Sequence, residues 1–584
     1  MKRNYIGLAN SFHDSAIAIV DDRGEVLFAE ATERYLQYKR SIGVAPDLFL
    51  RTSQLIHEHC EKGAELVLAK TWSDETPALM QQGMEKITQT LQMYNDAFGE
   101  TPWETRKQLM GQSFFFQSQL AMVRHPGHLL EYDLSQVNDP VFRQLQHRTY
   151  DHHLTHAMVG CVSSPFDEAV CAVLDGMGEK SAFACFRYEH GRVTPIHESE
   201  MVSWASLGFF YGTVCDVCGF GSMTGEEWKV MGLAAYGQYD EDIYNLLRAM
   251  LIVDGLSLKF APPVKFIKLQ ERLFALRRRK GQPAIEMANL AFCAQKVFCD
   301  VLFAFLNNLY DLGLSENLVL GGGCALNSSA NGQLITNTRF QKLHVFSAPG
   351  DDGNAVGAAL LARAEDHPGD RPVKVDVMSP YLGSRMNPEI LLNVERFGAI
   401  PKFTRCGDDA PKNAARLLAD GKIVAWVQGR AEFGPRALGN RSILADPRSP
   451  SIKETINARV KFREEFRPFA PSILHEHGDE YFEHYQESPY MERTLKFREA
   501  AARKVPGVVH EDGTGRLQTV KKHWNKRYHM LIEEFFRLTG IPLVLNTSFN
   551  VMGKPIAHSV EDALAIFYTS GLDAMFIDDV LIEK

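Results

Sequence analysis

The fold of this chain is constrained most by a strand–turn–strand pattern that occurs twice, far apart in the sequence. The segment SAIAIVDDRGEV begins at Ser15, and SAFACFRYEHGRV begins at Ser181. An apolar run precedes each copy, YIGLA before the first and EAVCAVLDG before the second. Apolar runs bounded by polar and glycine turns are typical of strands. The duplication therefore predicts an α/β domain built from two like halves.

The segments around the two copies predict the rest of this domain. We expect residues 46–150 to be mostly helical, because they are rich in Gln, Met and Leu. Further on, NLVLGGGCALN indicates a buried strand followed by a glycine turn, where backbone can approach a ligand closely. Residues 364–384 lose periodicity and collect Pro, Gly and Asp. We therefore predict one domain over 1–375 and a second α/β domain over 376–584.

Composition excludes several classes of protein. A length of 584 residues predicts two or three domains. The net charge of −9 argues against a surface that binds nucleic acid, and no segment resembles a membrane span or a signal peptide. Ten scattered cysteines predict a reducing cytoplasm. We expect the lone pair Cys215 and Cys218 to be core thiols and the basic run 276–283 to be a solvated loop.

Three histidines fall within five positions of the segment DHHLTHAMVG. In a helix, His152 and His156 lie one above the other on one face, since side chains four residues apart share a face. At that spacing two neutral imidazoles bind one metal ion. The alternative is a buried histidine cluster without a metal.

The second predicted domain contains arginine motifs that alternate with glycines. QGRAEFGPRALGNRSILADPR and KFREEFRPFAPS frame the chain from 428 to 472, and HEDGTGRLQTV follows later. Glycines free the backbone to surround an anion, and guanidinium groups bind phosphate through two hydrogen bonds. LNTSFN adds hydrogen-bonding groups just after an apolar strand. These motifs indicate an anion pocket rather than an ordinary solvated surface.

The chain contains the motifs FHDSA, DHHLTHA, WKVMGLAAYG, LGGGCALN, GDDGNAVGAA, GRAEFGPRALGNRSILADPR, FREEFRPFAPS, DGTGRLQTV and LNTSFNVMGKPI. Together these motifs resemble those of the NodU/CmcH carbamoyltransferases. The resemblance covers the whole chain except residues 75–145. It implies a duplicated actin-like (ASKHA) domain, similar to the tRNA threonylcarbamoyladenosine transferase, followed by a YrdC-like α/β domain. Trp228 departs from the family, whose members tend to carry a small residue there, and it puts the shape of the acceptor pocket in doubt.

The resemblance also implies an activity. ATP and carbamoyl phosphate would be co-substrates that form carbamoyl adenylate, with Mg²⁺ left open. The carbamoyl group would then pass to a hydroxyl of a small natural product such as an antibiotic, toxin or sugar. We expect a small-molecule alcohol as partner, no nucleic acid and no membrane; a homodimer is left open, and the acceptor is not identified.

The family's functional residues map onto this sequence in four groups. The metal, Fe(II) or another divalent ion, would be bound by His152, His156 and Asp351, with Asp352 as the fallback and His153 pointing elsewhere. Catalysis would fall to His13, Asp14 and Lys39. The first domain would bind nucleotide through Asp175, Gly176, Gly321, Gly322, Gly323 and Asn327. The second would bind carbamoyl phosphate and ATP through Arg436, Arg441, Lys461, Arg467, Arg516 and Asn546.

Two other functions are compatible with parts of this pattern. Two histidines and a carboxylate also bind iron in non-haem oxygenases, although those ligands usually lie on a β-barrel. An actin-like fold also occurs in carbohydrate kinases, but such kinases lack the arginine motifs of the second domain.

Overall fold

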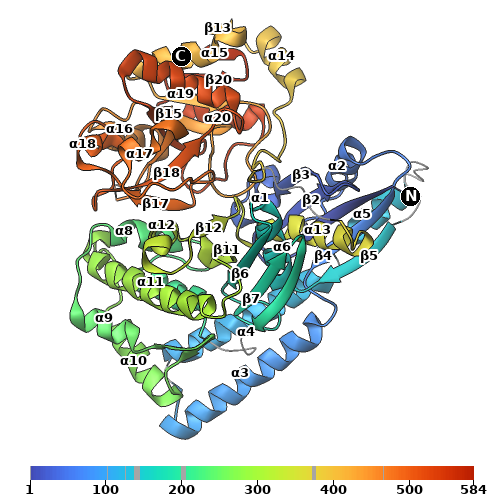
Figure 1. Ribbon diagram of the computed structural model, residues 1–584, viewed down its shortest axis with the longest axis vertical. Helices are drawn as coiled ribbons and strands as arrows, with labels where there is room; N and C mark the ends of the chain where they lie inside the picture. Colours follow the sequence, from blue (N-terminus) through green and yellow to red (C-terminus); the bar gives the residue numbers. More distant parts are fainter. Residues whose placement is uncertain are drawn as a thin grey trace. The chain divides into compact units, whose positions relative to one another are not determined.

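The computed structural model (Figure 1) describes residues 2–101, 103–124, 126–136, 145–198, 205–370, 376–400, 402–464 and 466–584. The chain forms two compact units. Unit 1 comprises 1–32, 40–326 and 334–378, and unit 2 comprises 33–39, 327–333 and 379–584. Two short segments of the first 375 residues thus belong to unit 2. The predicted boundary follows residues 371–375, which lie outside the described residues.

Unit 1 contains two five-stranded sheets of the same topology. The first has the order β3-β2-β1-β4-β5 and the second β8-β7-β6-β11-β12, reading each from its antiparallel edge. In both, the first strand pairs antiparallel with its hairpin partner and parallel with the next strand beyond. The strands are β1 (Arg3–Ala9), β2 (Ala16–Val20), β3 (Val26–Ala31), β4 (Glu65–Thr71), β5 (Leu145–Tyr150), β6 (Glu168–Leu174), β7 (Phe183–Glu189), β8 (Arg192–Glu198), β11 (Asn317–Gly321) and β12 (Lys342–Val345). The predicted duplication is confirmed, and the fold is the predicted α/β actin-like type.

The expectation of a mostly helical region over 46–150 is confirmed by the helices Arg51–His59, Thr76–Phe98, Trp103–Arg124 and His128–Gln136. The sequence did not predict the strands β4 and β5, which also lie within this region. The strand β4, ELVLAKT, carries a buried apolar core and pairs parallel with β1. The strand β5, LQHRTY, is a polar edge strand with little apolar pattern of its own. Pairing with β4, rather than local sequence, makes it a strand.

Helices cover the sheets of unit 1. They are α2 (Arg51–His59), α3 (Thr76–Phe98), α4 (Trp103–Arg124), α5 (His128–Gln136), α6 (His152–Ser163), α7 (Leu207–Val217), α8 (Glu227–Ala234), α9 (Glu241–Arg248), α10 (Pro263–Ala275), α11 (Ala288–Tyr310) and α13 (Asn354–Asp366), with the small hairpin β9 (Leu251–Asp254) and β10 (Ser257–Phe260). The small residues of α13 allow close packing on α6: a Cβ on Gly357 would lie 2.0 Å from the carbonyl oxygen of Thr155.

One helical stretch of the described residues, 284–310, is long and apolar enough to cross a membrane. Within its most apolar window, 72% of the residues are buried inside the protein. Such burial is typical of a core helix, and packing accounts for its apolar composition.

Arg279 and Lys280 of the run 276–283 are exposed as expected, but Arg277 and Arg278 are only partly exposed. The guanidinium of Arg277 donates two hydrogen bonds of 3.1 Å to Glu104 on α4. Arg278 donates to the carbonyl of Gly219 and lies 5.1 Å from the ring centroid of Phe220. Tertiary partners that are distant in sequence therefore hold this basic segment.

Unit 2 is built on one mixed sheet of the order β13-β21-β20-β14-β15-β19-β16-β18-β17. Its strands are β13 (Lys402–Arg405), β14 (Val424–Val427), β15 (Arg441–Ala445), β16 (Ala470–Leu474), β17 (Arg493–Lys496), β18 (Thr514–Val520), β19 (Leu543–Ser548), β20 (Ala574–Ile577) and β21 (Val580–Glu583). Its helices are α14 (Pro388–Phe397), α15 (Ala410–Ala419), α16 (Ile452–Ile456), α17 (Gly478–Tyr481), α18 (Glu499–Ala502), α19 (Lys526–Thr539) and α20 (Val560–Thr569). The remaining helices, α1 (Thr32–Leu36) and α12 (Ser328–Asn337), each contribute residues to both units. The predicted α/β character of this part is confirmed; its likeness to a YrdC domain stays a prediction.

Candidate functional site

The helix α6 brings the paired histidines to one place, as their spacing predicts. It begins at His152 because Asp151 caps it, accepting a 2.9 Å hydrogen bond from the amide of Leu154. Buried Glu179 accepts the amide of His152 at 2.9 Å. The indole of Trp72 stacks on the His152 ring, with centroids 4.2 Å apart. The position of the first imidazole is therefore determined by a cap, a buried carboxylate and an aromatic ring.

Two carboxylates complete a buried group that we call the donor cluster: His152, His156, Asp175 and Asp351. One ligand atom from each lies within 4.8 Å of all the others. Asp175 Oδ2 is 3.2 Å from His152 Nε2, and Asp351 Oδ1 is 3.7 Å from Nε2 of both histidines. Among the described residues this is the group whose side chains have the geometry to hold a metal ion.

The donor cluster fits a divalent metal ion. Both ring nitrogens of His156 are buried without a hydrogen-bond partner, which is costly unless a further group binds there. Nitrogen and oxygen ligands lie about 2.0–2.2 Å from such an ion, so they lie about 3–3.5 Å from one another. The observed separations are close to this range. Rotating the amide of Asn354, which lies 3.3 Å from His152 Nδ1, would let its oxygen accept from that nitrogen and leave Nε2 for a metal.

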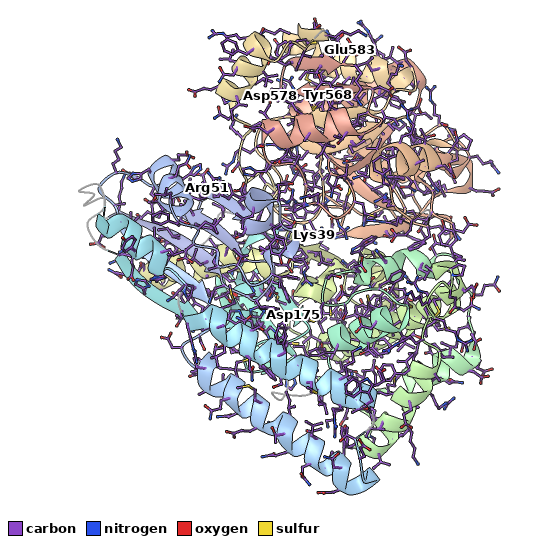
Figure 2. All side chains as sticks on the ribbon, turned by 180° about the vertical axis from the view of Figure 1, so that it is seen from behind. Lys39, Arg51, Asp175, Tyr568, Asp578 and Glu583 are labelled. Carbon is purple, nitrogen blue, oxygen red and sulfur yellow. The ribbon has the colours of Figure 1, made fainter. Side chains whose placement is uncertain are left out.

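Asp175 is the member of the donor cluster that sequence reasoning assigned differently, as a nucleotide-binding residue. It follows the buried strand β6 (Figure 2). Its Oδ1 accepts hydrogen bonds from the amides of Gly176 at 2.7 Å and Gly323 at 3.2 Å. The turn at Gly322 has φ +83°, and a Cβ there would lie 2.3 Å from the carbonyl oxygen of Leu174. The predicted glycine turn thus does bring backbone close to a polar group, and that group is a carboxylate of the cluster.

The turn after β1 reaches the same cluster. His13 Nδ1 lies 3.0 Å from Asp14 Oδ2 and 3.8 Å from Asp351 Oδ2. Arg40 Nη2 donates to Asp14 at 2.7 Å. Burial alone would raise the pKa of Asp14, but Arg40 and His13 outweigh it and hold this pKa well below its usual range. Asp14 is therefore an anion that orients the His13 ring. Arg40 was not among the predicted residues, and nothing in its local sequence distinguishes it from a surface arginine.

The other residues predicted in the first domain lie outside the donor cluster. His153 lies outside the donor cluster, with Nδ1 2.9 Å from Ser181 Oγ, and burial lowers its pKa to about 4. Asp352 is also outside it and accepts the amide of Gly353. Asn327 and Lys39 lie in the segments that belong to unit 2. The positive charge of Lys39 is near enough to Lys461 to lower the pKa of that amine.

Unit 2 contains the opposite kind of site, which we call the cationic cluster: Arg436, Lys461, Arg463, Arg467 and Arg516. Burial, and then the charges of Arg436, Arg463 and Arg467, lower the pKa of Arg516 well below its usual value. Burial lowers the pKa of Arg436 to about 10, and burial with Arg467 lowers that of Arg463 to about 9. Arg516 Nε is buried without an acceptor. An anion would relieve this repulsion and supply the acceptor.

Arg463 belongs to this cluster although it was not among the predicted phosphate ligands. The sequence could have indicated it, because Arg463 lies in the motif KFREEF between the predicted ligands Lys461 and Arg467. Its Nε donates to Asn457 Oδ1 at 2.9 Å, and its guanidinium lies 4.5 Å from the ring centroid of Phe469. These contacts hold the side chain in one orientation beside its cationic neighbours.

Three predicted residues of unit 2 hold the site together. Arg441 is 0% exposed and donates to the backbone carbonyls of Gln428, Asn440, Ser384 and Gly429. Asn546 Nδ2 donates to Ser472 Oγ at 3.0 Å and Gln518 Oε1 at 3.1 Å. Lys461 Nζ donates to Asn550 Oδ1 at 2.7 Å and to the carbonyl of Ser548. The motif LNTSFN thus positions a lysine, and the geometry favours a structural role for Arg441.

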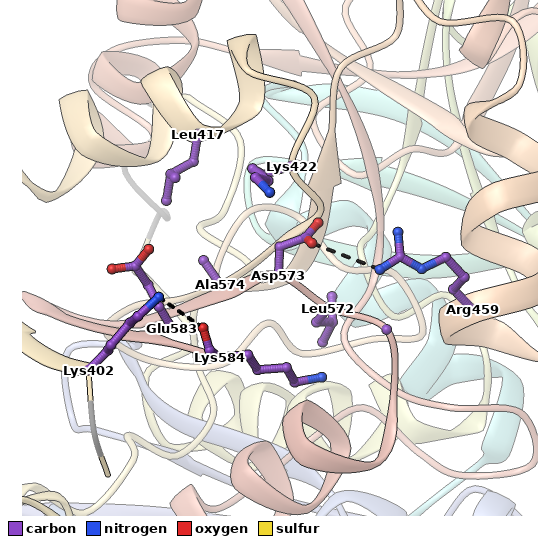
Figure 3. A pocket seen from close by; sticks show the side chains of 10 residues that line it. Lys402, Leu417, Lys422, Arg459, Leu572, Asp573, Ala574, Glu583 and Lys584 are labelled. Carbon is purple, nitrogen blue, oxygen red and sulfur yellow. Dashed lines mark hydrogen bonds and ion pairs between the residues drawn. The ribbon is translucent and has the colours of Figure 1, made fainter.

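A separate polar hollow of about 270 Å³ lies elsewhere in unit 2 (Figure 3). Its charged lining is Lys402, Lys422, Arg459, Asp573, Glu583 and Lys584. Arg459 and Asp573 form a long ion pair of 3.9 Å across it. The hollow contains no predicted site residue and none of either cluster.

Comparison with known families decides the class of protein. Residues 4–360 match a family model described as the carbamoyltransferase N-terminus, and residues 415–584 match the carbamoyltransferase C-terminus. The chain belongs to the carbamoyltransferase family. This confirms the predicted resemblance, and the protein is a carbamoyltransferase enzyme.

Relatives of this carbamoyltransferase include nodulation proteins. NolNO of Sinorhizobium fredii is 37% identical over 74% of this chain and 63% of its own length. NolO of Bradyrhizobium diazoefficiens is 37% identical over 74% and 79%. The protein sll1178 of Synechocystis is 31% identical over 99% and 96%. Among solved structures, full-length HypF in its phosphate- and nucleotide-bound form is 12% identical over 62% of this chain and 55% of its own, with a TM-score of 0.32. Likeness at that level says nothing about activity.

Proposed function

We propose that this carbamoyltransferase forms carbamoyl adenylate from ATP and carbamoyl phosphate at the cationic cluster, then transfers the carbamoyl group to an alcohol at the donor cluster. The observation that supports this is the opposite charge of the two sites. One gathers imidazoles and carboxylates suited to a cation, and the other gathers cations suited to phosphates. The acceptor would be a small-molecule natural product.

In the activation step, water releases phosphate from carbamoyl phosphate, and the resulting carbamate attacks the α-phosphate of ATP. The products are phosphate, pyrophosphate and carbamoyl adenylate. Negative charge builds up on the transferring phosphates, so donors aimed at those oxygens lower the barrier. Arg436, Arg463 and Arg516 have the charge and the burial for this task.

In the transfer step, the acceptor hydroxyl must lose a proton as its oxygen attacks the carbamoyl carbon and AMP leaves. His13 is the candidate base, because Nδ1 faces Asp14 and Asp351 and leaves Nε2 for the hydroxyl. A divalent ion bound by His152, His156 and Asp351, with Asp175 as a further ligand, would supply Lewis-acid polarisation of the carbamoyl carbonyl. Asp14 and Arg40 hold the base in place.

Separate variants test this division of labour. Arg436→Ala should abolish pyrophosphate release from ATP and carbamoyl phosphate, yet still use synthetic carbamoyl adenylate supplied from outside. His13→Ala should release pyrophosphate but fail to carbamoylate the alcohol. Products are followed by mass spectrometry over a panel of alcohols. Failure of folded Arg436→Ala to use the preformed intermediate would contradict the proposal.

The same assay distinguishes the two rival functions. Oxygen uptake with 2-oxoglutarate would indicate an iron oxygenase, and ADP formation without a carbamoyl donor would indicate a kinase. Either result, in place of AMP and pyrophosphate, would replace the proposed mechanism.

A further inference from the structure

The helix α4 lies against the turn that carries the candidate base, although its sequence lies in the part of the chain that least resembles the family. Gln119 is 0% exposed; its Oε1 accepts the amide of Phe12 at 2.7 Å, and its Nε2 donates to the carbonyl of Asn10 at 3.2 Å. One helical turn earlier, the ring of Phe115 lies 5.9 Å from that of His13 between centroids. This face of α4 therefore positions the base.

Aromatic rings lie on one side of His13 as a result. The Phe12 ring makes edge-to-face contacts with Phe114 and Phe115, whose centroids lie 6.1 and 5.9 Å away. Of the His13 side chain 23% is exposed, and Phe114 is 58% exposed. A molecule that reaches His13 from solvent meets aromatic carbon beside it.

The apolar surface continues along α4 away from His13. Trp103, Met110 and Phe114 lie within about 40° of one another around the helix and span about 16 Å along it. They are 66%, 58% and 58% exposed. The buried face of the helix is a different one, where Leu109 and Phe116 pack with Trp72, Met80 and Ile267. The helix thus presents one apolar face to the core beside α3 (Figure 1), and three exposed apolar side chains, with the exposed Lys107 among them, to solvent.

We propose that the exposed stripe Trp103–Met110–Phe114 binds an apolar group of the acceptor alcohol. The inference rests on the proposed function, because a hydroxyl that reaches His13 brings its own carbon skeleton against Phe12, Phe114 and Phe115. Burying a large apolar side chain on binding changes affinity about tenfold or more. The acceptor class is therefore an alcohol borne on an extended apolar ring or chain.

Two glucosides with one sugar but different alkyl groups test this on the full chain. Binding of octyl and methyl β-D-glucopyranoside is measured by calorimetry below the concentration at which the octyl compound forms micelles. We expect octyl glucoside to bind at least about tenfold more tightly, and Met110→Ser or Phe114→Ser to weaken it about tenfold. The control Met93→Ser, at a position 43% exposed on α3, should change nothing.

Equal affinity for the two glucosides, absence of binding by octyl glucoside, or an equal loss in Met93→Ser would overturn the proposal. So would a dimer, seen by light scattering, that Phe114→Ser converts to monomer, since the stripe would then join two copies of the chain. Binding to phosphatidylcholine vesicles that is lost in Phe114→Ser would likewise reassign it to a membrane surface. None of these measurements needs a carbamoyl donor. Failure of the proposed function would appear separately, as absent pyrophosphate release in the unaltered protein.

Discussion

The donor cluster of unit 1 and the cationic cluster of unit 2 are both buried, but their charges are balanced in opposite ways. In the donor cluster, Asp175 and Asp351 face imidazoles, and backbone amides of glycine turns support Asp175. In the cationic cluster, burial and then neighbouring guanidinium groups lower the pKa of Arg516, and Glu464, 3.4 Å from Arg467, is the acidic partner among the described contacts. Buried charge is costly without a partner of opposite sign. The first cluster is therefore nearly complete without substrate, whereas the second needs an anionic one.

The strongest test of this contrast removes one imidazole. His156→Ala should lose the metal and all transfer, because this buried ring has no hydrogen-bond partner at either nitrogen and supplies one of the cluster's ligand atoms. Loss of a direct ligand should cost more than the 10–100-fold in metal affinity typical of an outer-shell change, roughly 100-fold or more. Metal content is measured by atomic emission. The matched control is His153→Ala, since that buried ring contacts Ser181 instead; full occupancy in His156→Ala would refute the assignment.

The next test separates cations that act on a ligand from those that hold the fold. Arg516→Ala should reduce pyrophosphate release by about 10²–10³-fold, as loss of an aimed donor does, without loss of stability. Arg441→Met should instead lower the free energy of unfolding by about 2–4 kcal/mol, because four backbone carbonyls each lose a charged donor. Urea unfolding and product assays compare the two. Equal behaviour of both variants would remove the distinction.

A smaller loss of metal affinity is expected when a residue that contacts a ligand, but is not itself a ligand, is replaced. Asn354→Leu removes the amide beside His152 Nδ1 and leaves every direct ligand in place. Metal affinity should fall about 10–100-fold, with a normal maximum of bound metal at saturation. Titration with Fe²⁺ or Zn²⁺ under anaerobic conditions measures it. An unchanged affinity would show that the other contacts of His152 hold its ring without this amide.

The smallest effect concerns His510, near the cationic cluster. Burial lowers its pKa to about 4; Asp512 opposes this shift, while Arg516 and Lys453 add to it. The unfolded chain, with an ordinary pKa of about 6.5, binds this proton more readily. The contribution of His510 to the free energy of unfolding is therefore fully present above about pH 6.5, and it is lost as the pH drops toward 4. His510→Asn should lose less stability than the unaltered protein over that window, as measured by urea midpoints; parallel curves would contradict the shift.

Much of the fold was predictable because it depends on local patterns. The hairpins β2–β3 and β7–β8 and the helix α6 follow from apolar runs, turn residues and helical spacing. The strand β5 was missed, since its polar sequence becomes a strand only beside β4. Arg277 was expected in solvent, because its partner Glu104 is far away in the sequence.

The sequence by itself determined the family, the duplicated half-domains, the pair His152 and His156, and the arginines Arg436, Arg467 and Arg516 of the cationic cluster. Each of these features depends on residue type and short-range spacing, and both can be read from the amino-acid sequence. Only the tertiary structure decided that Asp175 meets Asp351 at those histidines and that Arg441 is occupied by carbonyls. It also decided that α4 leads an exposed apolar stripe to His13. Contacts between distant segments depend on how sheets and helices pack, and packing is a property of the whole chain.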